Sequence, residues 1–203
     1  MSVKKNLLVF AKDAELSELK ARKEDEINEL KKEMAVPLSD GDIREHLNNP
    51  LILKYSELDE YGTLDNLLPN IKSYCVVLYE HSPNTGHWIC ISRPREGIAE
   101  YYDSFGGYID CPLTWTPKAI LEKLDSAYPT LSRMFDECPE EVVYNKIKYQ
   151  KEGNGVNNCG RWCVLRIKKM LDGMNLNQFY DFCKKESERL KLPFDAMVTA
   201  LIN

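Results

Sequence analysis

The chain has 203 residues, of which 43% are hydrophobic and 29% are charged. This length suits one domain with a substantial hydrophobic core, and the composition argues against disordered, collagen-like and fibrous proteins. The formal net charge of −5 provides no electrostatic footprint for nucleic acid, so nucleic-acid binding is not expected from the bulk charge. The remaining candidate for a nucleic-acid surface is a local basic patch formed by Arg161, Arg166, Lys168 and Lys169.

The first apolar run, residues 7–11, is too short for a signal-peptide core or a membrane span. We therefore expect a soluble intracellular protein with no membrane partner. The seven cysteines form an odd count without paired spacing, and in a reducing compartment they are better interpreted as free, mostly buried thiols. Cys159 and Cys163 are four positions apart, but no second pair completes a zinc site, so we expect no metal and no other cofactor.

Residues 13–34 contain neither Gly nor Pro and carry a spaced set of apolar side chains, which predicts one amphipathic helix ended by Pro37 and the turn at residues 39–41. We therefore divide the chain into an N-terminal helical arm, residues 1–36, and a domain, residues 37–203. The arm either rests its apolar stripe on the domain or acts as a partner-binding or coiled-coil helix, although Lys23 interrupts its short heptad pattern. It is not catalytic on either interpretation.

The remaining elements are predicted from hydrophobic period and turn residues. Short apolar runs predict strands at residues 74–79, 88–92, 98–102 and 142–149, with turns at 83–86 and 94–97. Helical patterns occur at residues 39–47, 117–127, 159–171, 176–190 and 194–202, and Gly173 follows the third of these as a C-terminal cap. Residues 111–139 otherwise read as loops broken by prolines. The expected fold class is α+β, with helices packed against a small mixed sheet.

Three short motifs carry the chemistry, namely Gly86-His87-Trp88, Tyr102-Asp103-Ser104 and Asn158-Cys159-Gly160. A cysteine attacks a carbonyl well only as a thiolate, an imidazole can take its proton, and a carboxylate behind the imidazole fixes its tautomer. The nucleophile comes last here, whereas papain-like enzymes place the cysteine first.

Cys159 follows two asparagines that favour helix caps and opens a helical pattern, where the positive end of the helix dipole favours a thiolate. Gly160 leaves room for a substrate backbone to approach. The competing histidines are His46, in an early helical segment, and His81, which lacks a Trp neighbour.

Asp103 ends a strand that should neighbour the His87 strand, so a hairpin would bring its carboxylate behind the ring. Asp110 is the rival for that place. Trp162 is expected in the core, and Trp88 is expected either in the core or in contact with substrate.

Around these residues the sequence resembles the adenovirus-protease and SUMO-protease-like cysteine peptidases, from Cys75 to about Met170. That family has His-Trp at the start of a strand, Asp near the end of the next strand, a Gln before the nucleophile and Cys-Gly at the start of a helix. The resemblance implies Cys159 as nucleophile, His87 as general base and then acid, and Asp103 as the residue that orients the imidazole. It also implies an oxyanion hole made by the Gln150 amide with the Cys159 backbone N–H.

Gln150 lies nine positions before Cys159, more than is usual in the family, so Asn154, Asn157 or Asn158 could replace it. In the resembling enzymes the residue after the catalytic His helps to wall a narrow tunnel. Trp88 and Gly160 would then border a cleft for small residues, commonly glycines, before the scissile bond.

The chain also resembles the maturation proteases of large DNA viruses, their satellite viruses and related mobile elements. This implies hydrolysis of viral capsid or core precursors through an acyl-enzyme, in the host cytoplasm, a virus factory or the virion. The alternatives are a protease acting on SUMO or ubiquitin-like tails, and an acetyltransferase with the same triad.

Overall fold

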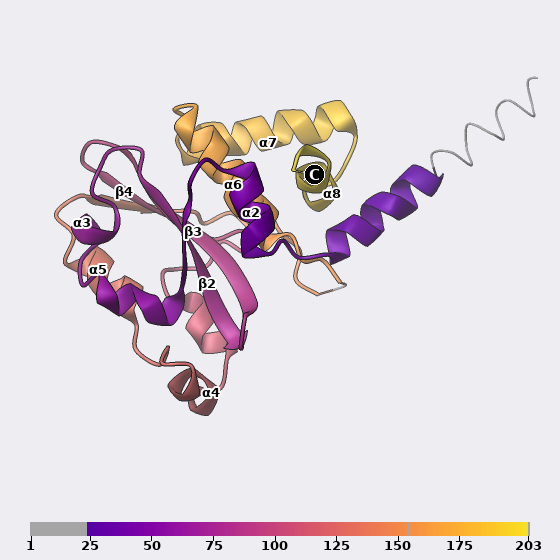
Figure 1. The fold of residues 1–203 in the computed structure, drawn as a ribbon. Helices are drawn as coiled ribbons and strands as arrows, with labels where there is room; N and C mark the ends of the chain where they lie inside the picture. Colours follow the sequence, from indigo (N-terminus) through magenta and orange to yellow (C-terminus); the bar gives the residue numbers. More distant parts are fainter. Residues whose placement is uncertain (1–23, 154, 203) are drawn as a thin grey trace, which may run out of the picture.

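The computed structural model describes residues 24–153 and 155–202, which fold around one five-stranded sheet in the order β1-β2-β3-β4-β5 (Figure 1). The strands are β1 (Leu51–Lys54), β2 (Tyr74–Ser82), β3 (Thr85–Arg95), β4 (Ile98–Tyr102) and β5 (Glu141–Tyr144). The two outer pairs, β1 with β2 and β4 with β5, are parallel, and the two inner pairs are antiparallel. The sheet is therefore mixed, and with its helices it confirms the α+β class. No helix within the described residues is long and apolar enough to cross a membrane.

The two faces of the sheet support separate hydrophobic clusters, because successive side chains of a strand point to opposite faces. Val76, Cys90 and Tyr102 are adjacent across the sheet and belong to the cluster that contains α6 (Cys159–Leu171). Val77 and Ile89 face the opposite side, where the 3-10 helix η1 (Tyr55–Glu60) and the helices α3 (Leu64–Leu67) and α5 (Thr130–Asp136) pack.

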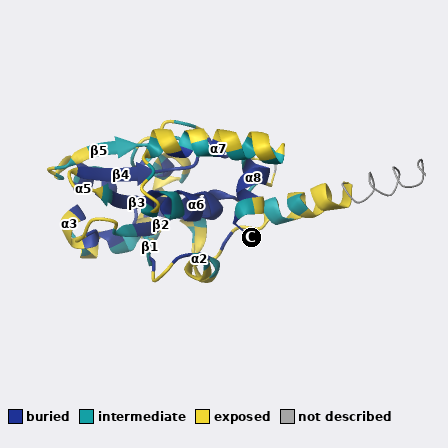
Figure 2. Cartoon of the chain, turned by 90° about the horizontal axis from the view of Figure 1, so that it is seen from above, coloured by how far each residue is buried: buried dark blue, intermediate teal, exposed yellow. Residues whose placement is uncertain are grey.

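Helix α6 is the central helix of the fold and is buried along most of its length, as Figure 2 shows. It packs against β3, and its Trp162 and Arg166 contact the Phe179 ring of α7 (Leu176–Leu190). Its Arg166 forms a bidentate ion pair with Glu100 of β4, with N–O distances of 2.7 and 2.6 Å. Arg161, also in α6, is 5% exposed, and Arg166 is 1% exposed. These two arginines are therefore not available as part of a nucleic-acid surface. The remaining helices are α2 (Asp40–His46), α4 (Lys118–Lys123), α8 (Phe194–Leu201) and the 3-10 helix η2 (Cys111–Trp115).

Several predicted boundaries are wrong for identifiable reasons. Strand β3 continues through Pro94 instead of ending before it, and the register shift between Ser92 and Arg95 accommodates the missing N–H of that proline. The strand predicted at residues 142–149 pairs only over β5, because β4 ends at Tyr102 and offers no further partner. Strand β1 and helix α5 were not predicted, and α4 is shorter than the predicted helix at 117–127.

The helices predicted at 39–47, 176–190 and 194–202 are confirmed as α2, α7 and α8. Gly173 caps α6 as predicted, with a φ of +90° and its N–H donated to the Met170 carbonyl.

Residues 24–35 form a helix that leads away from the body of the domain in both views (Figures 1 and 2). Leu30, Glu33 and Met34 are its half-buried positions, whereas Ile27 is 48% exposed. The first part of the predicted arm helix, residues 13–23, lies outside the described residues.

Candidate active site

His87 stands near the beginning of β3, directly after the tight connection from β2. Its strand partner is Tyr79, and the preceding Gly86 lies so close to the Tyr79 carbonyl that a side chain at position 86 would collide with it. Glycine at that position therefore lets β3 approach β2 closely enough to fix the His87 backbone. The His87 side chain is buried, with 8% of the residue exposed.

Asp103 follows the last residue of β4 and is fully buried. Its Oδ1 accepts a hydrogen bond from Nε2 of His87 at 2.7 Å and another from the backbone N–H of Phe105 at 2.9 Å. Nδ2 of Asn145 donates to the Asp103 carbonyl at 2.6 Å, which anchors the backbone at this point. Oδ1 of the carboxylate is thus held against the imidazole, whereas Oδ2 is buried without a hydrogen-bond partner among the described residues.

Asp110, the rival for that place, lies elsewhere. Its carboxylate accepts hydrogen bonds from the hydroxyls of Tyr55 and Tyr79, at 2.7 and 2.8 Å, and from the backbone N–H of Ser132 at 2.7 Å. These groups belong to the face of the sheet opposite α6. Asp110 therefore anchors loops in that layer, and Asp103 alone of the two carboxylates contacts His87.

Cys159 is the first residue of α6, and its thiol interacts with the imidazole of His87. Because Nε2 of His87 is bonded to Asp103, Nδ1 is the ring atom left for the sulfur. Burial alone would raise the pKa of Cys159, but the hydrogen bond and charge of His87, together with the backbone N–H groups of Trp88 and Gly160, lower it below the usual value. The first turn of a 13-residue helix supplies a positive dipole end to the same sulfur.

The pKa of His87 moves in the complementary direction. Burial would lower it, but hydrogen bonds to Asp103 and Cys159 raise the pKa of His87 to about 9. A lowered thiol pKa beside a raised imidazole pKa favours a thiolate–imidazolium pair near neutral pH. The three residues predicted from sequence are therefore brought together with electrostatics suited to nucleophilic attack.

The start of α6 is held by α8 and not by its own cap. Asn158 occupies the N-cap position, but its side chain makes no capping bond. Instead Nδ2 of Asn158 donates to the Asp195 carbonyl at 3.0 Å, and its Oδ1 accepts from the Thr199 hydroxyl at 3.2 Å. The expected capping by Asn158 is therefore wrong. Its side chain instead attaches the backbone just before Cys159 to α8.

Gln150 is buried between the Asp103 segment and the loop that leads to Cys159. Its Oε1 accepts from the hydroxyl of Ser104 at 2.9 Å, and its Nε2 donates to the Val156 carbonyl at 3.2 Å. One hydrogen of that amide is thus engaged within the loop. Of the substitutes considered for it, Asn157 and Asn158 are both bonded to other segments, and residue 154 lies outside the described residues.

A short stretch after the arm, residues 34–38, lies against the nucleophile's helix. Asn157, Arg161 and Trp88 donate hydrogen bonds of 2.7 to 3.0 Å to its backbone carbonyls. A Cβ on Gly160 would meet the Leu38 Cβ at 3.0 Å and the Trp88 Cδ1 at 3.2 Å. Trp88 is 7% exposed, so it packs in the core and also borders Gly160.

Sequence reasoning missed the aromatic side chains around the imidazole. Phe105 stacks on His87 with ring centroids 4.8 Å apart, and Trp115 contacts the imidazole edge-on at 5.2 Å. Both come from loops or a short 3-10 turn, where no hydrophobic period exists to mark them. His81 is exposed, and neither His81 nor His46 contacts Cys159 in the described hydrogen bonds and ring contacts.

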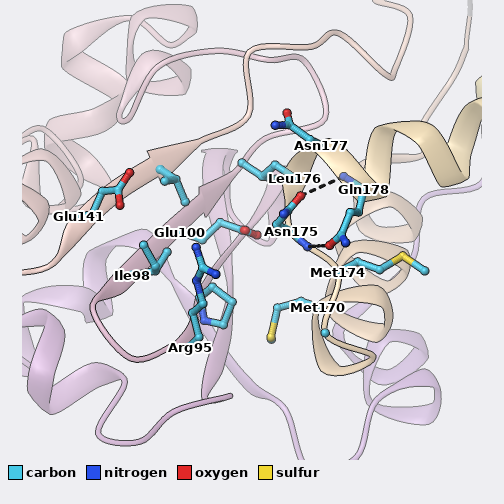
Figure 3. Close-up of a pocket in the computed structure, with 13 residues that line it drawn as sticks. Arg95, Ile98, Glu100, Glu141, Met170, Met174, Asn175, Leu176, Asn177 and Gln178 are labelled. Carbon is cyan, nitrogen blue, oxygen red and sulfur yellow. Dashed lines mark hydrogen bonds between the residues drawn. The ribbon is translucent and has the colours of Figure 1, made fainter.

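A larger cavity, of about 580 Å³, lies at the other end of the sheet, between the β3–β4 turn and the α6–α7 turn (Figure 3). Three of its polar side chains are committed to structure: Glu100 pairs with Arg166, and Asn175 and Gln178 form the capping box of α7. The smaller openings beside His87 are the ones that border the candidate chemistry. Within the described residues, no cluster of three or more His, Cys, Asp or Glu side chains could hold a metal ion.

Comparison with known proteins gives one relative of high coverage. The chain is 35% identical over 176 residues to "Uncharacterized protein V9" of the Sputnik virophage, across 86% of this chain and 99% of that protein. No protein-family model matches the chain. Since the similarity extends over almost the whole of the virophage protein, the chain belongs to the same protein family as V9 of the Sputnik virophage.

Proposed function

We propose that this protein is a cysteine endopeptidase of the adenovirus-protease and SUMO-protease-like type. The observation that carries the proposal is the position of the His87 imidazole, which lies between a buried carboxylate at 2.7 Å and a thiol of lowered pKa at a helix N-terminus. These three residues lie far apart in sequence, yet they meet in the order carboxylate, imidazole and thiol, which is the order that nucleophilic catalysis requires.

In the proposed reaction the Cys159 thiolate attacks the carbonyl carbon of the scissile peptide bond. The proton of the thiol resides on Nδ1 of His87, while Asp103 stabilises the imidazolium through Nε2. The carbonyl oxygen becomes an oxyanion, which needs donors already aimed at it. The backbone N–H of Cys159 has no partner within its helix and is one such donor. The second hydrogen of the Gln150 amide is the other.

Collapse of the tetrahedral intermediate breaks the C–N bond, and His87 gives its proton to the leaving nitrogen. The product is a thioester between Cys159 and the N-terminal part of the substrate. His87 then takes a proton from water, which attacks the thioester and releases the acid. The cycle ends with the thiolate–imidazolium pair restored, and it requires no cofactor.

The proposed substrates are polypeptides with small residues before the scissile bond. The nucleophile is only 7% exposed, and Leu38 and Trp88 already crowd the space beside Gly160. Approach to Cys159 is thus narrow, and a bulky side chain next to the scissile carbonyl would clash. Membership in a family that includes a virophage protein supports the maturation of capsid or core precursors as the biological setting.

A peptide-library cleavage profile tests the proposal. The wild-type protein should cleave after small residues, Cys159→Ala should be inactive, and Cys163→Ala, one turn further along α6, should retain activity. Ubiquitin-like proteins ending in Gly-Gly and acetyl-CoA serve as parallel substrates. Acetyl transfer without peptide cleavage, or equal cleavage by Cys159→Ala, would contradict the proposal.

A further inference from the structure

A pocket of about 350 Å³ opens beside His87, and Trp115 and Tyr79 form two of its walls. Pro112, Thr116 and the exposed His81 complete its walls, and among the described residues neither Cys159 nor any carboxylate, lysine or arginine lines it. A neighbouring opening of about 270 Å³ is lined by Phe105, Trp115 and Glu152. The indole of Trp115 is therefore the wall that both openings share.

Trp115 is unusual in being a large aromatic residue left 48% exposed at the rim of a buried site. Its ring lies 5.2 Å from the imidazole of His87 and 5.5 Å from the ring of Phe105, with edge-on geometry in both cases. The backbone of η2, with Pro112 near its start, fixes where the indole stands. An exposed aromatic side chain in such a fixed position is typical of a binding surface.

The chemistry of the proposed reaction determines which part of a substrate would meet this surface. His87 must deliver its proton to the leaving nitrogen, so the residue that follows the scissile bond has to lie next to the imidazole. The acyl half of the substrate lies by contrast against Cys159, Gly160 and Trp88. The pocket between His87 and Trp115 is thus placed to receive the first side chain of the leaving half.

The walls of the pocket indicate the class of that side chain. They consist of aromatic rings, Pro112 and Thr116, and the hydroxyl of Tyr79 is already donated to Asp110 at 2.8 Å. Apart from the His87 imidazolium, which the Asp103 carboxylate already pairs, the described residues bring no carboxylate, lysine or arginine into the pocket to recognise an acidic or basic substrate residue. Apolar contact with the indole face is therefore the main interaction available.

We propose that Trp115 is the specificity-determining residue for the position directly after the scissile bond, and that this position takes a bulky apolar or aromatic side chain. The inference rests on the proposed peptidase function. It adds a requirement on the leaving half of the substrate to the small residues expected in the acyl half.

Acyl transfer to added amines tests this directly, because the amine occupies the place of the leaving residue. A Gly-Gly alkyl ester would load Cys159, and phenylalanine amide, leucine amide, glycine amide and glutamate amide would compete to capture the acyl group. We expect the wild-type protein to favour phenylalanine and leucine amides over glycine amide by on the order of tenfold or more. Trp115→Ala should bring this ratio close to unity, and Trp115→Phe should retain part of it.

The ratio is the readout because removal of the indole also exposes the His87–Asp103 pair and can lower every rate together. Tyr128→Ala is the matched control, since Tyr128 is an aromatic residue that is 60% exposed and is not part of either pocket. Circular dichroism would verify that each variant is folded.

Equal capture of all amines, a preference for glutamate amide, or an unchanged ratio in Trp115→Ala would overturn the assignment of Trp115 while leaving the peptidase proposal intact. Failure of Cys159 to form any acyl-enzyme would refute the peptidase proposal itself, and the role of Trp115 with it.

Discussion

Replacement of His87 by alanine isolates the electrostatic feature on which the proposed chemistry depends. In the wild-type protein, burial raises the pKa of Cys159, but the hydrogen bond and charge of His87, together with the backbone N–H groups of Trp88 and Gly160, outweigh it. In His87→Ala, burial remains and the largest stabilisation of the thiolate is gone. The pKa of Cys159 should therefore rise to at least the ordinary thiol value of 9.0.

The size of the effect follows from the titration. A thiol of pKa 9.0 is about 0.1% ionised at pH 6, so alkylation of the variant at that pH should be almost abolished. The wild-type protein should react at lower pH than the variant because its thiol pKa is lowered. Its thiolate–imidazolium pair should persist as pH rises until His87 loses its proton at about 9.

The assay is the rate of iodoacetamide labelling of the peptide that contains Cys159, measured by mass spectrometry between about pH 5 and about pH 10. Burial raises the pKa of Cys75, Cys163 and Cys183, which keeps these thiols unreactive across the acid part of that range. His81→Ala, which removes an exposed histidine, is the control and should follow the wild type. A wild-type profile centred on an ordinary thiol pKa, or an unchanged profile in His87→Ala, would refute the reasoning.

Three further substitutions test the surrounding residues. Asp103→Asn should lower kcat by roughly three to four orders of magnitude, because an amide cannot stabilise the imidazolium. The pH profile of Cys159 alkylation should shift to higher pH in the same variant. Gln150→Ala should lower kcat by on the order of a hundredfold or more with little change in the alkylation profile, and equal losses in both would contradict a role in the oxyanion hole. Trp88→Ala should reduce the free energy of unfolding by about 3–5 kcal/mol in denaturant titration and relax the preference for small residues before the scissile bond. An unaltered preference in a folded Trp88→Ala would show that this indole does not shape the cleft.

The three central residues could be predicted from sequence because each lies in a short motif whose local structure is decided by near neighbours. His87 follows a turn, Asp103 comes directly after a strand and Cys159 opens a helix, and adjacent Gly, Asn and apolar residues indicate each of these positions. The pairing of β3 with β4 then brings His87 and Asp103 to hydrogen-bonding distance. Local signals and sheet topology agree at this point.

The elements that were not predicted depend on distant partners. Strand β1 has only four residues and exists because it pairs in parallel with β2, more than twenty positions further along the chain. At the end of β5, Asn145 replaces strand pairing by bonding the carbonyls of Asp103 and Ile147. No hydrophobic pattern distinguishes such contacts from those of a longer strand.

The surroundings of the site show the same limit. Phe105 and Trp115 reach His87 from irregular segments, and residues 34–38 reach the start of α6 through their carbonyl groups. Backbone carbonyls are common to every residue and carry no sequence signal. Contacts of this kind become visible only when the folded chain is known.

Direct observation of the acyl-enzyme tests the central claim most directly. The protein would be mixed with a peptide that it cleaves, quenched in acid within the first turnover, and analysed by mass spectrometry after digestion. We predict a mass increase equal to the acyl half of the substrate on the peptide containing Cys159, removable by hydroxylamine as expected of a thioester and absent from Cys159→Ala. Turnover of the peptide without any adduct on Cys159, or an adduct on another cysteine, would contradict the account.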